Sequence, residues 1–356
     1  MYPVLKNCRI RGNVGDFYLQ NLKNGYIFKL EDLQAKILWY CNGKNDISLI
    51  SKKFYQSKRN LLSFFQFFKN ENLLDLSKKQ INNIVFPLPL KNPQLKEVQI
   101  EITGKCNLWC LHCYGRSDFK KTARNELTTK ELEELFNQLQ ELNIERCFLS
   151  GGESFTRKDL PILIKQLAKR HIYIGGIFTN GTIYREDVIK AIKKTGQDIV
   201  FLVSLDGHSS TTHNFLRGKG NFEKTISFIK KVKKLGFWVT INTIVTKRNV
   251  NYLMEMYKFL ECLGINRWRV SIPREQGECI KNKEIVMPNN EDFFNAYKDL
   301  LKYHVENKTK MKIQLSSIFK TEFIKNKCYY LYQNTNSCCE YKRWSLTIQS
   351  NGNVIS

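Results

Sequence analysis

Residues 97–114 read EVQIEITGKCNLWCLHCY, in which a short run of alternating hydrophobic residues leads directly into three cysteines. Cys106, Cys110 and Cys113 have the spacing Cys-x3-Cys-x2-Cys. Three thiolates can ligate three irons of a [4Fe–4S] cube and leave the fourth iron open to a small ligand. A structural zinc site is the alternative, but it needs four ligands, usually in two pairs, and no second pair follows nearby. The spacing therefore favours an iron–sulfur cluster at the end of a strand.

The cysteine triplet, with Tyr114 directly after it, resembles the cluster motif of the radical S-adenosylmethionine (SAM) enzymes. The resemblance implies that the three cysteines hold a [4Fe–4S] cluster and that Tyr114 lies at the SAM site. In that family the reduced cluster cleaves SAM to methionine and a 5′-deoxyadenosyl radical, which abstracts hydrogen from an unactivated C–H bond. His112 stands where the family has a bulky side chain, so we expect it to pack against the cluster.

From residue 96 to residue 310 the pattern alternates between strands and amphipathic helices. One helix, expected over 128–142, begins with a capping box made by Thr128 and Glu131. Six such units without a glycine-rich dinucleotide fingerprint predict an α/β fold, a partial (β/α)6 TIM barrel. Parallel barrels place their functional residues at the carboxyl ends of the strands. The strands are expected near residues 97–102, 147–150, 172–178, 199–205, 237–245 and 267–272.

Each further motif follows one of these strands. Gly151-Gly152-Glu153 resembles the family's Gly-Gly-Glu-Pro motif, which binds the amino group of SAM, although Ser154 replaces the proline. Paired glycines allow a ligand to approach the backbone closely, and a carboxylate can pair with an ammonium group. Taken alone, such motifs could be ordinary turns, and the arginine beyond the fourth strand could be a surface residue. The resemblance implies contacts to the ribose and carboxylate of SAM by Asn180, Ser204, Asp206 and Arg217.

Residues 1–85 form a separate unit, followed by a linker at 86–95 that contains three of the chain's seven prolines. Residues 15–20 and 25–30 flank a polar turn and predict a β-hairpin, and three helical patterns follow. This order resembles the small winged-helix, PqqD-like domain that opens many peptide-modifying radical SAM enzymes. In those enzymes the leader segment of a precursor peptide adds a strand to the hairpin edge. A generic winged helix that binds DNA is the alternative.

Residues 311–356 contain a second cysteine pattern. Gly352 lies thirteen positions after Cys339, with a strand and an Asn-Gly turn expected between them. The pattern resembles the start of the family's SPASM domain, a cysteine-rich domain that binds auxiliary [4Fe–4S] clusters, and it makes Cys339 a candidate metal ligand. The next cysteine of that pattern would fall one position beyond Ser356. We therefore expect the auxiliary-cluster domain to be truncated here as part of a longer protein; the alternative is a chain that has lost its auxiliary clusters.

The remaining cysteines lie in other kinds of pattern. The amino terminus has no signal-peptide core and no apolar run reaches membrane-spanning length, so we expect a cytoplasmic protein with reduced cysteines. Cysteines in strand or helix patterns are typically small core residues. This group contains Cys8, Cys41, Cys147 and Cys262. Cys328 and Cys338 could supply a ligand in a rearranged cluster site, and Cys279 has no assigned role.

The chain is strongly basic, with 57 Lys and Arg against 33 Asp and Glu and a net charge of +24. Such a charge favours an acidic partner or nucleic acid, although solvated lysine faces need no partner. The resemblance implies a radical SAM enzyme that modifies a ribosomally synthesised precursor peptide, with a thioether or another crosslink within the peptide as the product. Flavodoxin or ferredoxin would be the electron donor, and neither a membrane nor nucleic acid is an expected partner. The alternatives are a radical SAM enzyme that acts on tRNA or another protein, and a non-catalytic peptide-binding scaffold.

Overall fold

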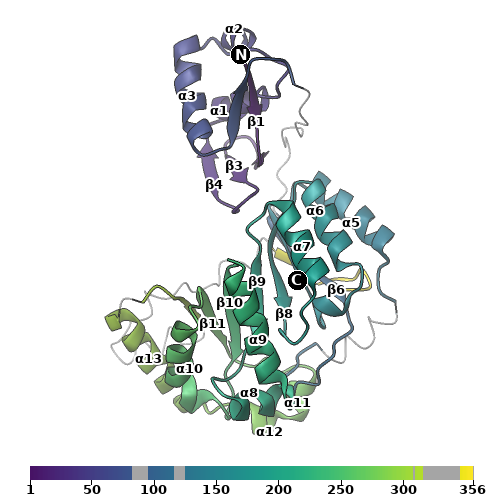
Figure 1. Cartoon of the computed structure of the whole chain (residues 1–356), viewed down its shortest axis with the longest axis vertical. Helices are drawn as coiled ribbons and strands as arrows, with labels where there is room; N and C mark the ends of the chain where they lie inside the picture. The colour runs from purple at the N-terminus through teal and green to yellow at the C-terminus, as the bar shows by residue number, and fades with distance from the viewer. Residues whose placement is uncertain (82–94, 116–124, 308, 316–344, 356) are drawn as a thin grey trace.

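The chain folds into two units that lie one above the other in Figure 1. The smaller unit is residues 1–81, and the larger unit is an α/β domain that begins at residue 95. Cys328, Cys338, Cys339 and most of the expected linker lie outside the described residues, so the role expected for Cys339 stays a prediction. The computed structural model describes residues 1–81, 95–115, 125–307, 309–315 and 345–355.

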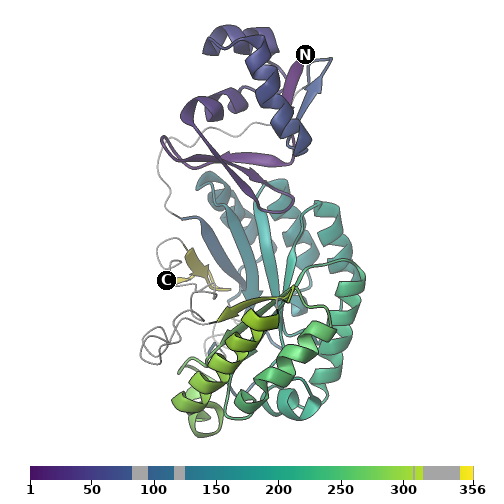
Figure 2. The same ribbon diagram turned by 90° about the vertical axis from the view of Figure 1, so that its left-hand side faces the viewer.

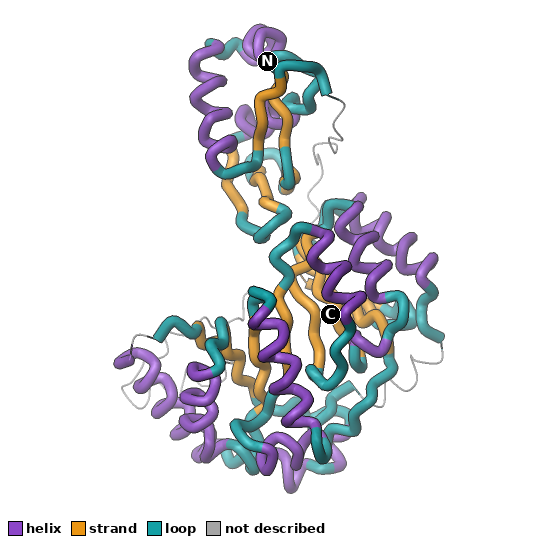
Figure 3. The backbone as a smooth tube through the Cα atoms, in the orientation of Figure 1, coloured by secondary structure: helices purple, strands orange, loops and turns teal. Residues whose placement is uncertain are grey.

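A mostly parallel sheet forms the centre of the larger unit (Figure 3). Its first six strands follow one another in sequence order, and each is paired in parallel with the next. The sheet is not closed among the described residues, so the predicted partial (β/α)6 TIM barrel is confirmed. The six predicted strands are also confirmed. They are β6 (Glu97–Thr103), β7 (Arg146–Gly151), β8 (Tyr173–Thr179), β9 (Val200–Ser204), β10 (Val239–Ile244) and β11 (Arg267–Ser271).

Helices follow the strands and cover the outer face of the sheet (Figure 2). Helix α5 (Thr129–Glu141) starts with the predicted capping box, in which the side chains of Thr128 and Glu131 each accept a hydrogen bond from the other's backbone N–H. Aliphatic and aromatic side chains of strands and helices form one continuous core. Within the described ranges, no helix has the length and apolar character needed to cross a membrane. The other described helices of eight or more residues in this unit are α6 (Leu160–Lys169), α7 (Glu186–Thr195), α8 (Ser210–Arg217), α9 (Asn221–Lys234), α10 (Leu253–Cys262) and α13 (Asn290–Asn307), and two short ones are α11 (Glu278–Lys281) and α12 (Lys283–Val286).

The sheet continues past residue 310, where the barrel was expected to end. Strand β12 (Lys312–Leu315) pairs in parallel with β11, and β13 (Ser345–Ile348) pairs in parallel with β6. Strand β14 (Val354–Ile355) returns antiparallel to β13. Gly352 lies in the turn between β13 and β14 with φ +90°, a conformation that favours glycine. The predicted strand and Asn-Gly turn after Cys339 are therefore present.

The amino-terminal unit contains the predicted hairpin and the three predicted helices. Strands β1 and β2, which are too short to show a clear period, were not predicted. The side chains of Asp46 and Ser57 cap the second and third helices by accepting from backbone N–H groups. The elements are β1 (Tyr2–Leu5), β2 (Cys8–Arg11), β3 (Phe17–Asn21), β4 (Ile27–Leu30), α1 (Asp32–Trp39), α2 (Ile47–Phe54), α3 (Lys58–Asn70) and β5 (Leu74–Ser77). The sheet order is β2-β3-β4, and β1 pairs separately with β5.

The hairpin turn determines which backbone groups of β4 face outward. Gly25 N–H donates to the carbonyl of Asn21, and Asn21 N–H donates to the carbonyl of Tyr26, which is the pattern of a G1 bulge. Gly25 has the required positive φ of +75°. Because antiparallel ladder bonds alternate, Ile27 and Lys29 direct their N–H and C=O groups away from β3. This outer edge of β4 has no strand partner in the part of the chain that the structure describes.

Two arginines of β2 attach the small unit to the amino-terminal end of the barrel sheet. Arg11 is fully buried and donates to the carbonyls of Asn143 (3.0 Å) and His171 (3.1 Å). Arg9 donates to the carbonyl of Gln140 at 2.9 Å. Those carbonyls belong to the carboxyl ends of α5 and α6, where unsatisfied oxygens carry partial negative charge. The small unit therefore caps two barrel helices.

Further polar contacts strengthen this interface. The Tyr18 hydroxyl donates to the carboxylate of Glu145 at 3.1 Å, and Asp198 N–H donates to the carbonyl of Lys23 at 2.5 Å. Burial, together with the charge of Arg9, lowers the pKa of Arg11 to about 9. Glu145 supplies the negative charge that offsets part of this cost. The interface is thus built from buried polar groups that need one another as partners.

The cysteines outside the motif divide into buried and exposed ones. Cys41 and Cys147 are buried and Cys8 is half-buried, as expected for small core residues. The expectation for Cys262 is wrong, because this residue ends α10 and is exposed. Cys279 is buried and packs with Leu216 in a small cluster of apolar side chains, so it is a core residue of that cluster.

Replacing Arg11 by alanine should loosen the two units from each other. The change leaves the carbonyls of Asn143 and His171 without their donor, and we expect the free energy of unfolding to fall by about 2 kcal/mol or more. Hydrogen exchange followed by mass spectrometry should show faster exchange in peptides covering 138–146 and 168–174. Arg59→Ala, at an exposed arginine of α3, is the control and should leave both regions protected. Unchanged protection in Arg11→Ala would contradict the capping role.

Candidate functional site

The three motif cysteines lie on the loop that follows β6, at the carboxyl edge of the sheet. Cys106 is exposed, Cys113 is half-buried and Cys110 is buried. Burial raises the pKa of Cys106 and raises that of Cys110 to about 12, and the other motif cysteines add to both shifts. The three sulfurs are therefore close enough to interact electrostatically. Their thiolates would need a bound metal group to compensate their charge.

This arrangement fits a [4Fe–4S] cube. Among the described residues, no three His, Cys, Asp or Glu side chains converge on a single ion. A cube does not need such convergence, because its cysteines bind three different irons. Hydrogen-bond donors also face the sulfurs: Leu108 N–H donates to Sγ of Cys106 at 3.4 Å, and Arg217 donates to Sγ of Cys110 at 3.8 Å. Donors of this kind are a usual feature of cluster sites.

The cysteine loop is held by residues that follow three other strands. After β8, Asn180 donates to the side-chain oxygen of Asn107 at 2.9 Å, and Asn107 donates to Thr182 at 2.8 Å. After β9, the carbonyl of Leu216 accepts from Leu111 N–H at 3.0 Å. Helix α11 (Glu278–Lys281) follows β11, and Glu278 N–H donates to the carbonyl of Cys113 at 2.9 Å. The loop is therefore fixed from several sides.

The Gly-Gly-Glu segment after β7 packs directly against the cysteine loop. Gly152 N–H donates to the carbonyl of Thr103, and Glu153 N–H donates to the carbonyl of Lys105, both at 2.8 Å. A Cβ atom on Gly152 would lie 2.7 Å from the carbonyl carbon of Lys105 and 3.0 Å from Cβ of Cys106. Only glycine allows this close approach, so the pair of glycines places the Glu153 turn beside the cysteines.

The carboxylate of Glu153 is buried and already has several protein donors. It accepts from Phe155 N–H (3.0 Å), from the Thr179 hydroxyl (2.8 Å) and from Asn180 N–H (2.6 Å). Burial raises its pKa, and these hydrogen bonds oppose the shift. Glu153 therefore joins the end of β7 to the end of β8. The adjacent hydroxyl of Ser154 is buried and has no hydrogen-bond partner among the described residues.

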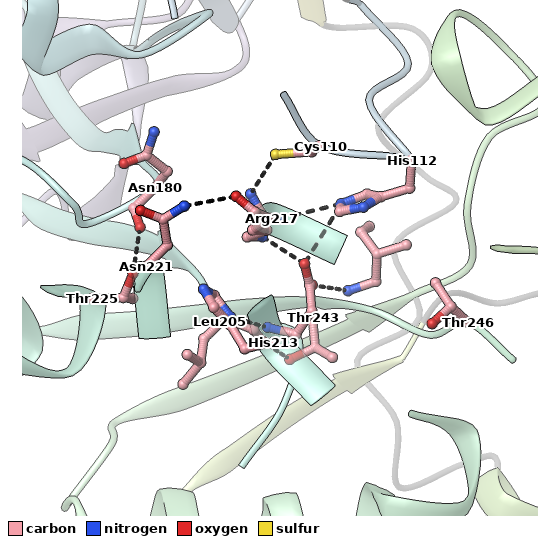
Figure 4. A network of polar contacts seen from close by, with 12 residues as sticks. Cys110, His112, Asn180, Leu205, His213, Arg217, Asn221, Thr225, Thr243 and Thr246 are labelled. Atoms are coloured by element: carbon pink, nitrogen blue, oxygen red, sulfur yellow. Dashed lines mark hydrogen bonds and ion pairs between the residues drawn. The ribbon is translucent and has the colours of Figure 1, made fainter. Parts of the chain in front are cut away.

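A buried polar network lies beneath the cysteine loop (Figure 4). Arg217 Nε donates to Asp206 Oδ2 at 2.5 Å, and Arg217 Nη2 lies 3.3 Å from Nε2 of His112. Asp206 also accepts from Ile244 N–H at 2.8 Å, while its own N–H donates to Nδ1 of His213 at 3.2 Å. The network brings together two residues of the motif after β9 and a residue of the cysteine loop.

Charge within this network is fixed by the Asp206–Arg217 ion pair. Burial alone would raise the pKa of Asp206, but the charge of Arg217 holds it below its usual value. Burial opposes the charge of Arg217, but Asp206 and Cys110 raise its pKa further above the ordinary value. Burial lowers the pKa of His112 to about 4, despite the opposing effect of Asp206. The ion pair is therefore charged near pH 7, and His112 is neutral.

The other expected SAM contacts lie at the same edge of the sheet. Ser204 is the last residue of β9, and Tyr114 follows the third cysteine with its ring 5.6 Å from the Arg274 guanidinium. Two further residues beside the cysteine loop, Gly277 and Asn282, were not predicted from the sequence. The side chain of Asn282 donates to the carbonyl of Leu111 at 3.1 Å. A signal for Gly277 existed, since it follows a barrel strand as the other motifs do. The contact between His112 and Arg217 had no signal in the sequence.

Comparisons with known proteins agree with this geometry. Residues 100–260 match the family model described as the radical SAM superfamily. The chain is 30% identical over 220 residues to an AdoMet-dependent heme synthase of Methanosarcina barkeri. This match covers 61% of this chain and 60% of that protein. It is 26% identical over 191 residues to a PqqA peptide cyclase of Granulibacter bethesdensis, covering 54% of this chain and 50% of that protein.

Similarity to solved structures extends over nearly the whole chain. The crystal structure of Streptococcus suis SuiB bound to precursor peptide SuiA matches with a TM-score of 0.71 and 18% sequence identity. The match covers 99% of this chain and 82% of that one, so it includes the amino-terminal unit as well as the barrel. At this identity the likeness concerns the fold.

Replacing Gly277 by alanine should reduce the ability of the chain to hold iron. Gly277 has φ +58°, and a Cβ atom there would lie 2.6 Å from the carbonyl oxygen of Cys113 and nearer still to that of Tyr114. The cysteine loop would have to move, so we expect at least a severalfold loss of iron after anaerobic reconstitution, measured by iron and sulfide content. Gly196→Ala is the matched control, because Gly196 also has positive φ (+69°) but open space around it. Equal iron loading in both variants would show that the packing of Gly277 against the cysteine loop is not needed to hold the iron.

Proposed function

We propose that the protein is a radical SAM enzyme, as the match of residues 100–260 to that family model supports, and that it cleaves SAM reductively and modifies a ribosomally synthesised peptide. The observation that carries the proposal is the packing of the Gly-Gly-Glu turn against a loop with three electrostatically coupled cysteines. The curated relatives cited above are matched over 60% and 50% of their length, so this activity is a proposal for the whole chain.

Cys106, Cys110 and Cys113 would ligate a [4Fe–4S] cluster, with SAM bound at its open iron. When bound, this pair supplies the one-electron cleavage of SAM that yields methionine and a hydrogen-abstracting 5′-deoxyadenosyl radical. The backbone at Gly151 and Gly152 would receive the amino group of SAM. Asn180, Ser204, Asp206 and Arg217, at or beyond the ends of β8 and β9, would orient its ribose and carboxylate. In support, Asn180 contacts Asn107 and Arg217 contacts Cys110, both on the cysteine loop.

The amino-terminal unit supports a peptide as the substrate. The outer edge of β4 presents the N–H and C=O groups of Ile27 and Lys29, which an extended peptide can pair with as an added strand. Exposed apolar side chains stand beside this edge, including Tyr26 (71% exposed) and Phe67 of α3 (52%). They could take alternate side chains of the docked strand. We assign this edge to the leader segment of the precursor peptide.

Reduction of the cluster requires an electron from outside the chain, for which we propose flavodoxin or ferredoxin. The barrel residues would then keep the reacting atoms together and away from water. The names of the two relatives indicate different reactions, since one is a heme synthase and the other a peptide cyclase, so the barrel alone does not select the substrate class. The β4 edge of the amino-terminal unit is what favours a peptide here.

SAM cleavage tests the proposed activity directly. We expect the anaerobically reconstituted chain to release 5′-deoxyadenosine from SAM in the presence of dithionite, quantified by liquid chromatography. A variant with Cys106, Cys110 and Cys113 all replaced by alanine should release none, because the cluster cannot bind. Equal release by both proteins, or no release by an unmodified chain with a full cluster, would exclude the radical SAM reaction.

Docking at β4 is tested by Lys29→Pro. Proline removes the outward N–H but is tolerated on an edge strand, so the fold should persist. We expect peptides selected against the whole chain from a displayed random library to bind this variant at least about tenfold more weakly, by fluorescence anisotropy. Lys29→Ala keeps the N–H and should bind normally, which separates loss of the backbone donor from loss of the lysine charge. Equal binding by the proline variant would mean that such peptides dock elsewhere.

A further inference from the structure

The guanidinium of Arg217 has three protein partners in three directions. Nε donates to the Asp206 carboxylate at 2.5 Å, Nη2 lies 3.3 Å from the ring of His112, and Nη1 donates to Sγ of Cys110 at 3.8 Å. Figure 4 shows the Arg217 side chain between Cys110 and His112. Every nitrogen of the guanidinium therefore already faces a protein atom, and one of those atoms is the sulfur of a cluster ligand.

This position of Arg217 is fixed by its surroundings. Asp206 is fully buried, its carboxylate also accepts from Ile244 N–H, and its backbone carbonyl accepts from the side chain of Asn249 at 2.7 Å. The carbonyl of Arg217 accepts from the side chain of Asn221, also at 2.7 Å. If the guanidinium moved away, the buried carboxylate of Asp206 would lose its main counter-charge, which is strongly unfavourable. Arg217 is therefore held with Nη1 toward the sulfur.

We propose that Arg217 is a positioning residue for the cluster ligand Cys110, and that its hydrogen bond to the sulfur raises the reduction potential of the [4Fe–4S] cluster. The proposal rests on the proposed function, because it requires a cluster on the three cysteines. It gives Arg217 a role in addition to the contact with the SAM carboxylate that the family resemblance implies. Asp206 and His112 then serve to orient Arg217.

The direction of the effect follows from the charges. Reduction adds one negative charge to the cluster, and a donor to a ligand sulfur stabilises the more negative state. The Asp206–Arg217 pair has no net charge, but its positive end faces Cys110 and its negative end lies behind. The ring of His112 lies 3.3 Å from Nη2 and holds the guanidinium in place. Removing Arg217 should therefore make the cluster harder to reduce.

The test is a redox titration of the reconstituted whole chain, followed by the electron paramagnetic resonance of the reduced cluster, before any SAM is added. The triple variant of Cys106, Cys110 and Cys113 gives the baseline. We expect the midpoint potential of Arg217→Gln to lie below that of the unmodified chain by about 59 mV. For one electron this corresponds to about a tenfold change in the equilibrium constant for reduction. Arg185→Gln is the matched control, since Arg185 is likewise paired with an aspartate, Asp187, at 2.5 Å but donates its other hydrogen bonds to backbone carbonyls, among them those of Arg157 and Lys158. Its midpoint should equal that of the unmodified chain.

A second variant separates loss of charge from loss of the hydrogen-bond geometry. Arg217→Lys keeps the positive charge and should give a midpoint between those of the unmodified chain and Arg217→Gln. A midpoint unchanged in both variants would overturn the proposal, and weaker SAM binding by calorimetry would then leave Arg217 only its contact with the SAM carboxylate. A chain that loads the cluster but releases no 5′-deoxyadenosine would exclude the proposed function while leaving this measurement valid.

Discussion

The buried ion pair between Asp206 and Arg217 is the interaction on which the site depends. It lies beneath the cysteine loop, where an unpaired charge would be very costly, so each partner fixes the other. Through Arg217 the pair reaches Cys110 and His112, and through Asp206 it reaches the end of β10 at Ile244. A loop with no regular structure of its own is thus attached to the rigid end of a parallel sheet.

The barrel sheet also separates the amino-terminal unit from the cysteine site. Figure 1 shows the amino-terminal unit at one end of the strands and α8 and α11 at the other. Strand β8 links the two ends, because His171 just before it receives Arg11, and Asn180 just after it contacts both Glu153 and the cysteine loop. Its seven residues span roughly 20 Å. A peptide docked at β4 would have to extend along the barrel to reach the cysteines.

Local signals in the sequence predicted much of this fold. The capping box at Thr128, the alternation of strands and helices, and the hairpin with its glycine turn are short-range features, because each depends on residues a few positions apart. Prediction failed where exposure depended on packing between distant elements, as for Cys262 at the end of α10. No short-range feature of the sequence predicted that Arg9 and Arg11 of β2 bind the ends of two barrel helices. Their acceptors are backbone carbonyls more than a hundred residues away.

For the site, the sequence by itself determined which residues could do chemistry: three cysteines at ligand spacing, a Gly-Gly-Glu turn, and polar groups at strand ends. Their meeting at one edge follows from the parallel barrel, because carboxyl ends of parallel strands point the same way. Only the tertiary structure decided how they are used. It engaged the Glu153 carboxylate with donors from β8, set Gly277 against the cysteine loop, and turned Arg217 toward Cys110. The physical reason is burial: a buried polar group needs a hydrogen-bond partner, and the fold determines which distant residue lies close enough to provide it.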